Sequence, residues 1–185
     1  MRTIEFFPAA RALALCLGTL ALASGSHAAG DKSAYESAKA AAKATYEAAK
    51  PKCDAMTGNA KDICVAEAKA ARTKAEVDAE AVYKDTPKAR EHAVNETAEA
   101  NYKVAKERCD DRTGNDKDVC IKVAKAALTR AKADAKANHK VADARNDAAK
   151  DKRDADYKVA AEKCDAMNGD AKSACVAQAK AKFGK

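Results

Sequence analysis

The sequence predicts an all-α protein built from three disulfide-stapled antiparallel helical hairpins. Alanine, lysine, glutamate and aspartate dominate the 185 residues, and charged residues reach 34%, as in long helices. Aromatic residues make up 4% and tryptophan is absent, so any core is thin. One phrase, with a cysteine at each end and a glycine between them, occurs three times. Its copies are CDAMTGNAKDIC from Cys53, CDDRTGNDKDVC from Cys109 and CDAMNGDAKSAC from Cys164.

The first segment of the chain predicts an export signal over residues 1–28. Arg2 and Arg11 precede the apolar run ALALCLGTLALA, and the small residues Ser26 and Ala28 suit cleavage after Ala28. The run is shorter than a membrane-spanning helix requires. A retained membrane anchor is the alternative interpretation.

The cysteine count fits an oxidising compartment. Removal of residues 1–28 takes away Cys16, which leaves six of the seven cysteines, an even number. We therefore expect the protein in the periplasm, with secretion from the cell as the second possibility. No other apolar segment follows, so no membrane span is expected after the signal is removed.

The middle of each phrase predicts the bend of an αα-hairpin. A glycine suits the left-handed residue that closes one helix, and the residue after it suits the N-cap of the next helix. The two cysteines lie at equal distances before and after this bend, so folding back brings them face to face. The predicted turn residues are Gly58, Asn59, Gly114, Asn115, Gly169 and Asp170. The predicted disulfides are Cys53–Cys64, Cys109–Cys120 and Cys164–Cys175.

Alanine lines the predicted contact between the two helices of each hairpin. Apolar positions recur every three or four residues, close to the seam of a coiled coil. In the first hairpin Tyr35 is expected opposite Val82, and in the third Phe183 is expected to complete the seam beside Tyr157. We expect no proline within the helices that flank the phrases. Such a seam buries little apolar area, so a staple near each bend is needed to fix its register.

The joints between hairpins differ. Thr86 and Pro87 suit the cap and the first residue of a helix, which predicts a break there. The second joint has neither glycine nor proline and permits one helix from about residue 116 to 166, with a local break near Asn146 as the alternative. An extended array and a loose bundle both remain open. The predicted hairpin units are 29–85, 86–140 and 141–185.

The chain offers few groups for catalysis. It has no phosphate-binding glycine loop, Ser/His/Asp arrangement or zinc-binding helix motif. The cysteines lack the CxxC spacing of thioredoxin-like enzymes, which favours structural disulfides over redox catalysis. A two-histidine metal site with Glu91 or Glu96 is one interpretation of His92 and His139, and exposed helix histidines are the ordinary alternative. We therefore expect no enzyme activity and no cofactor.

The charge pattern is typical of solvated helices. The formal net charge is +7, and lysines alternate with acidic residues along the predicted helices. No arginine-rich or aromatic strip suits nucleic acid, so no nucleic-acid partner is expected. The basic balance favours a weak attraction to anionic envelope surfaces, which salt would screen.

The second and third units carry a family resemblance. YKVAKERCDDRTGNDKDVCIKVAKAA and YKVAAEKCDAMNGDAKSACVAQAKAK resemble small exported Ala/Lys-rich Cys-repeat proteins of betaproteobacteria. Those proteins are mostly uncharacterised and are often labelled as similar to the helical stalk of the envelope protein TolA. The likeness covers most of residues 31–185. It implies an envelope setting and no catalytic residue, and the disulfide tips depart from a plain stalk.

These observations predict a non-enzymatic periplasmic helical repeat protein with a structural, interaction or stress-protective role in the cell envelope. Its partner would be an envelope protein or an anionic surface. A small binding module for a metal or an anionic envelope ligand is the first alternative, and a thiol–disulfide enzyme is the second. The sequence leaves the oligomeric state open.

Overall fold

The computed structural model describes residues 30–185, which form five helices and no strand. This arrangement confirms the all-α class. The predicted export signal lies outside the described residues. The helices are α1 (Lys32–Asp54), α2 (Gly58–Lys84), α3 (Pro87–Cys109), α4 (Gly114–Cys164) and α5 (Gly169–Phe183).

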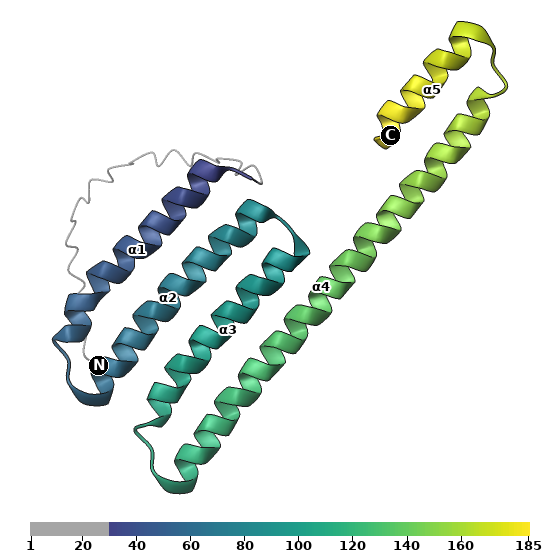
Figure 1. The fold of residues 1–185 in the computed structure, drawn as a ribbon. Coiled ribbons are helices and arrows are strands. Elements are labelled where there is room, and N and C mark those ends of the chain that lie inside the picture. Colours follow the sequence, from purple (N-terminus) through teal and green to yellow (C-terminus); the bar gives the residue numbers. More distant parts are fainter. Residues whose placement is uncertain (1–29) are drawn as a thin grey trace, which may run out of the picture.

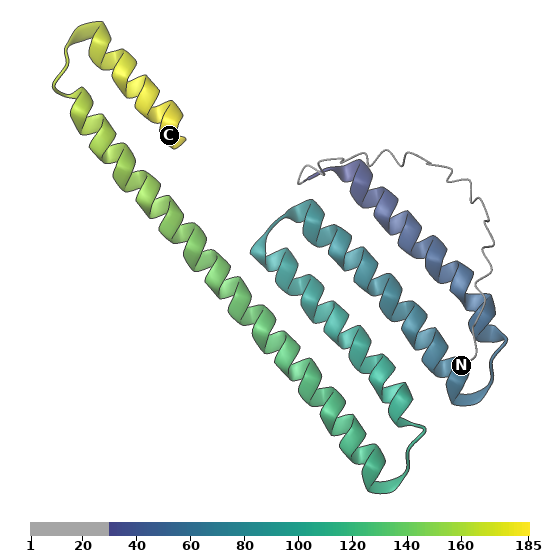
Figure 2. The same cartoon turned by 180° about the vertical axis from the view of Figure 1, so that it is seen from behind.

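Helices α1 to α4 lie side by side in chain order (Figures 1 and 2). Contacts join α1 to α2, α2 to α3, α3 to α4 and α4 to α5, and no other pair of these five helices is in contact. The first four helices form the layer, whereas α5 packs on the far end of α4, away from α3 (Figure 1). The chain is therefore an extended array, and the alternative of a loose bundle is wrong.

One continuous helix connects the second hairpin to the third. α4 has 51 residues and passes through Asn146 as regular helix, so the predicted local break is absent there. At 1.5 Å per residue such a helix is about 77 Å long. Residues 143–153 are exposed on every side and bridge the layer to the third hairpin.

The disulfide pairing is confirmed in all three hairpins. Cys53–Cys64, Cys109–Cys120 and Cys164–Cys175 join neighbouring helices with Cα–Cα separations of 5.4, 5.7 and 5.7 Å. These separations are ordinary for a disulfide. The first cysteine of each pair is buried, with at most 1% of its surface exposed.

The turns differ in detail from the prediction. The glycines are left-handed, with φ of 58°, 55° and 57°, but each begins the second helix of its hairpin and does not close the first. The first helix ends without a left-handed residue because backbone hydrogen bonds such as Met56 N–H to the Cys53 carbonyl tighten its last turn. Capping by Asn59, Asn115 and Asp170 is therefore wrong. The N-cap positions are Thr57, Thr113 and Asn168.

Small residues fill the seams. The buried apolar residues of the described chain are eight alanines, three cysteines and Val104. Tyr35 stacks on Tyr83 with ring centroids 4.9 Å apart, a contact that the sequence prediction missed. Val82, the expected partner, lines the same groove as Tyr35 and is 57% exposed. The stack has a simple physical reason. The Tyr83 ring offers the Tyr35 ring a larger apolar contact area than the Val82 side chain does. Tyr157 and Phe183 meet edge to face at 6.5 Å, as expected.

The two prolines next to helix ends behave differently from each other. Thr86 caps α3 by accepting a hydrogen bond from the Ala89 N–H at 3.1 Å, and Pro87 is the first residue of that helix, as predicted. Pro51 lies inside α1, so the expectation of proline-free helices is wrong. Pro51 stands in the last turn, where a helix is already close to its end. None of the helices described here is long and apolar enough to cross a bilayer.

Candidate interaction surfaces

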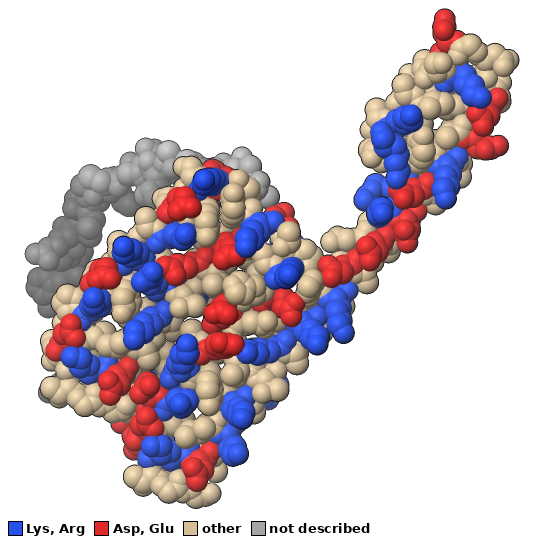
Figure 3. Space-filling model, in the orientation of Figure 1, with Lys and Arg blue, Asp and Glu red and all other residues tan. Residues whose placement is uncertain are grey.

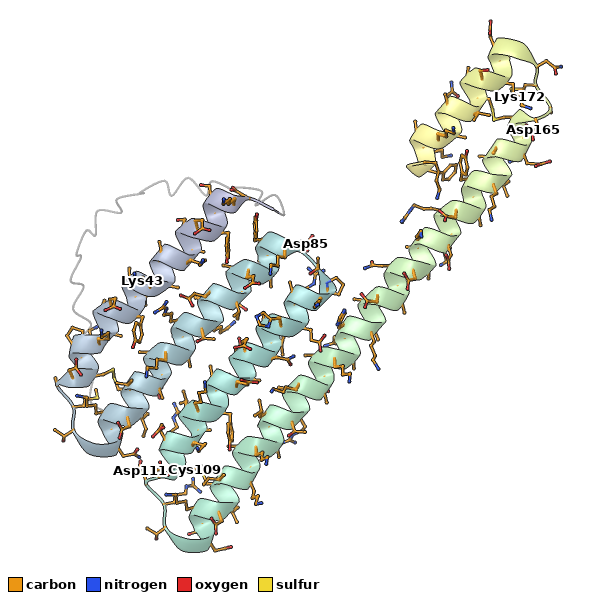
Figure 4. The ribbon with its side chains drawn as sticks, in the orientation of Figure 1. Lys43, Asp85, Cys109, Asp111, Asp165 and Lys172 are labelled. Atoms are coloured by element: carbon orange, nitrogen blue, oxygen red, sulfur yellow. A yellow bond between two sulfur atoms is a disulfide. The ribbon has the colours of Figure 1, made fainter. Side chains whose placement is uncertain are left out.

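Each hairpin tip carries the same ion pair. An aspartate directly after the first cysteine meets a lysine three residues before the second, and Figure 4 labels the third pair. The nitrogen–oxygen distances are 3.0 Å for Lys61–Asp54, 2.8 Å for Lys117–Asp110 and 2.8 Å for Lys172–Asp165. The sequence prediction missed these pairs, although both residue types are identical in all three phrases. The Asp110 carboxylate raises the pKa of Lys117 by accepting its hydrogen bond.

The first two tips are joined by a side-chain amide. Asn59 Nδ2 donates to the Glu107 carbonyl at 2.9 Å and to Asp111 Oδ1 at 2.6 Å. Arg108 adds an ion pair with Glu67 at 2.5 Å. The third tip lies at the opposite end of the molecule and has no neighbouring tip (Figure 4). The layer therefore presents two tips together, and the third hairpin presents its tip alone.

One broad side of the layer is densely charged. Figure 3 shows Lys, Arg, Asp and Glu interspersed over this side. We call it the charged face and define it by the residues that line a groove of about 640 Å³ between α2 and α3. Its charged lining residues are Asp62, Lys69, Arg72, Glu76, Lys103 and Glu107.

A basic band follows α4. Its residues recur at intervals of three, four or seven and so share one side of the helix. Among the described residues, only Lys132 of this band forms an ion pair, with Glu99 at 2.5 Å. That lysine holds the pKa of Glu99 below its ordinary value of 4.5 through a hydrogen bond and its charge. The band consists of Lys122, Lys125, Lys132, Lys136 and Lys140.

The opposite side of the layer, the apolar face, is grooved. Its largest groove has a volume of about 500 Å³ between α3 and α4 and is lined by Val94, Tyr102, Leu128 and several alanines. A second groove of about 310 Å³ lies between α1 and α2 and shares the lining residue Asp78 with the first. Neither shares a lining residue with the groove of the charged face. We define the apolar face by Val82, Val94, Asn101, Tyr102 and Leu128.

Helical spacing explains why the two faces are opposite. Asp78 of the apolar face and Glu76 of the charged face are two residues apart on α2, a rotation of about 200°. Asn101 and Lys103 stand in the same relation on α3. One pattern repeated on neighbouring helices thus places the two sets of grooves on opposite sides of the layer.

The histidines do not form the two-histidine metal site. His139 Nδ1 contacts Glu91 Oε2, and its Nε2 lies 3.0 Å from Asp143 Oδ2, so both ring nitrogens already face carboxylates on opposite sides. His92 is exposed. No cluster of three or more His, Cys, Asp or Glu able to hold a metal ion exists within residues 30–185. The metal interpretation is wrong for this part of the chain.

Comparison with known proteins adds no relative. No protein-family model, curated protein or solved structure matches the chain.

Proposed function

We propose that this chain is a non-enzymatic helical protein of the periplasm that serves as a structural or interaction element of the cell envelope. The observation that supports this proposal most is the single layer, which exposes two broad faces of opposite character. Its grooves are partly open to solvent, whereas the site of a small substrate usually encloses most of the ligand. The disulfides are consistent with an oxidising compartment.

Burial of one sulfur in every pair supports a structural role for the disulfides. Cys53, Cys109 and Cys164 are at most 1% exposed, whereas exchange needs a thiolate to reach the sulfur. We expect reduction potentials below about −300 mV, which would favour structural bonds over a thiol–disulfide enzyme.

Photo-crosslinking in cells tests the interaction role. A photo-reactive residue is placed at Val94 on the apolar face, at Lys136 in the basic band and, as the control, at Ala148 in the exposed bridge of α4. We expect crosslinked envelope proteins from one of the faces and few from the bridge. Reduced cysteines in a cytoplasmic fraction, or equal background crosslinking at all three sites, would contradict the proposal.

The basic band supports binding to an anionic envelope ligand as a second candidate function. Lys122, Lys125, Lys136 and Lys140 form no ion pair among the described residues, so their charge is available to a ligand. Changing these four lysines to Gln should abolish binding to vesicles that contain anionic phospholipid, and binding should weaken with salt. The matched control changes four exposed lysines of the third hairpin region, Lys150, Lys152, Lys158 and Lys163, to Gln. Equal loss in both variants would indicate a net-charge effect instead of a site.

A further inference from the structure

We infer that a second copy of this chain covers the apolar face, so that two layers of helices pack face to face. This inference deepens the proposed interaction role by naming the partner of one face. Helical domains ordinarily bury an apolar face against a second layer of structure. Residues 30–185 supply only one layer, and none of their helices covers the apolar face.

The apolar face has the composition of an interface. Val82 and Val94 are 57% and 45% exposed, and Tyr102 and Leu128 line the groove between α3 and α4 together with Val94. The charged face carries two lysines, one arginine and three acidic residues around its groove. An exposed face with few charges lowers solubility unless another surface covers it.

Three charged residues, Asp31, Lys74 and Asp78, line the grooves of the apolar face. Asp31 accepts hydrogen bonds from the Ser33 and Ala34 N–H groups at the start of α1, and the two others are paired with each other. Arg108, which lies two turns from Asn101 on the same side of α3, bonds to Glu67 of α2. The face is therefore close to neutral, and two copies meet without like-charge repulsion. The basic band, by contrast, would repel its own copy.

The available area is large enough for a stable dimer. α1, α2 and α3 have 23, 27 and 23 residues, so the layer is about 35–40 Å long. Four helices spaced about 9 Å apart make it about 30 Å wide. Each copy thus offers about 1,000 Å², and two copies would bury about 2,000 Å², above the roughly 1,600 Å² of an ordinary specific interface.

A two-fold axis fits this arrangement. The same patch is present on both copies, and a closed dimer needs a patch that complements itself. Larger side chains such as Val82, Val94 and Tyr102 stand among the alanines of this face, and they supply ridges and grooves for such packing. Because α5 and the end of α4 extend beyond the layer, the third hairpins would remain outside the interface (Figure 2).

Sedimentation of the full exported chain with intact disulfides tests this inference. We expect twice the mass of one chain at micromolar concentration. Val94→Glu and Asn101→Glu should each raise the dimer dissociation constant by about tenfold or more, because each buries a charge in the interface. Asn101 is exposed, so Asn101→Glu removes no core contact, and its fold is checked by circular dichroism.

The control is Val119→Glu. Val119 is 50% exposed and lies nine residues from Leu128, a rotation of about 180°, so it points to the open edge of α4. This variant should leave the dimer intact. A chain that sediments as a monomer at about 100 μM, whether or not detergent is bound to it, would overturn the inference. A dimer that dissociates with Val119→Glu but is unaffected by Asn101→Glu would also overturn it. Failure of envelope crosslinking alongside an intact dimer would sink only the proposed function.

Discussion

The third hairpin and the layer formed by the first two use the same staple in different surroundings. The Cα–Cα separation is 5.7 Å in both the second and the third disulfide. The first two hairpins also pack on each other along α2 and α3, where Ala70, Ala100 and Val104 form a buried cluster. The third hairpin packs only along α4 and α5, and α5 has 15 residues.

This difference shows how much a hairpin depends on its neighbours. In the third hairpin Cys164 and Ala179 are the buried apolar residues of the last part of the chain. An isolated helix of about 15 residues is marginal in water. The disulfide therefore carries a larger share of local stability at this tip than it does in the layer.

Removal of the third staple should have the largest effect. The double variant Cys164→Ser with Cys175→Ser loses about 3 kcal/mol of local stability, and we expect α5 to unfold from α4. Hydrogen exchange of residues 169–183 measures this loss. The matched change, Cys109→Ser with Cys120→Ser, should leave α3 and α4 helical because α2 still packs on α3. Equal protection of α5 with and without its disulfide would contradict the larger stabilising share assigned to the disulfide in the third hairpin.

Breaking the bridge should separate the two regions without unfolding either. Ala149→Pro places a proline in the exposed middle of α4, which costs about 3 kcal/mol locally. We expect the third hairpin to reorient relative to the layer, which small-angle scattering would detect as a changed maximum dimension. Ala149→Ser is the control and should scatter like the natural chain. Loss of protection across the whole layer would show that α4 is one cooperative unit.

The sequence predicted the parts of the fold that are local. Each disulfide joins residues 11 apart in sequence, so a bend halfway between Cys53 and Cys64 suffices to pair them. The sequence left open whether α4 is continuous or breaks near Asn146. Its bridge residues make no tertiary contacts, so no packing pattern in the sequence favours one alternative. The order of hairpins within the layer was not predictable, since one alanine seam resembles another.

The candidate surfaces were harder to foresee. Asn59 matched a capping pattern, yet it bonds to Asp111 across 52 residues, a partner that only the packed layer brings near. The division into an apolar and a charged face depends on which sides of α2 and α3 turn inward. The ion pairs at the tips were predictable, because both of their residues recur in every phrase.

Asn59→Ala should have an intermediate effect that is confined to the layer. It removes two hydrogen bonds between the first and second tips, and we expect a loss of about 1 kcal/mol. The midpoint of urea unfolding measures the loss. Asn115→Ala, at the matching position of the second phrase, is the control and should change the midpoint far less. Equal effects of the two variants would mean that Asn59 acts within its own turn.

Acid should produce the smallest effect, and it should act on both regions. Lys132 holds the pKa of Glu99 below 4.5 in the layer, and a hydrogen bond from Lys185 holds the pKa of Asp154 below 3.8 in the third hairpin. A carboxylate with a lowered folded pKa stabilises the fold above its ordinary pKa, and this contribution is lost as pH falls through the folded pKa. Both pairs are half-exposed, so we expect small losses that salt reduces further.

Carboxyl NMR titration with hydrogen exchange measures this acid effect region by region. Glu99→Gln should remove part of the acid sensitivity of the α3–α4 contact, and Asp154→Asn should do so only at the end of α5, where Lys185 lies. Glu99→Gln, in the layer, serves as the control for Asp154→Asn, in the third hairpin. The two sites are separated by the exposed bridge of α4, residues 143–153. If Asp154→Asn altered exchange within the layer, the two regions would be energetically coupled through the helix, and their independence would have to be abandoned.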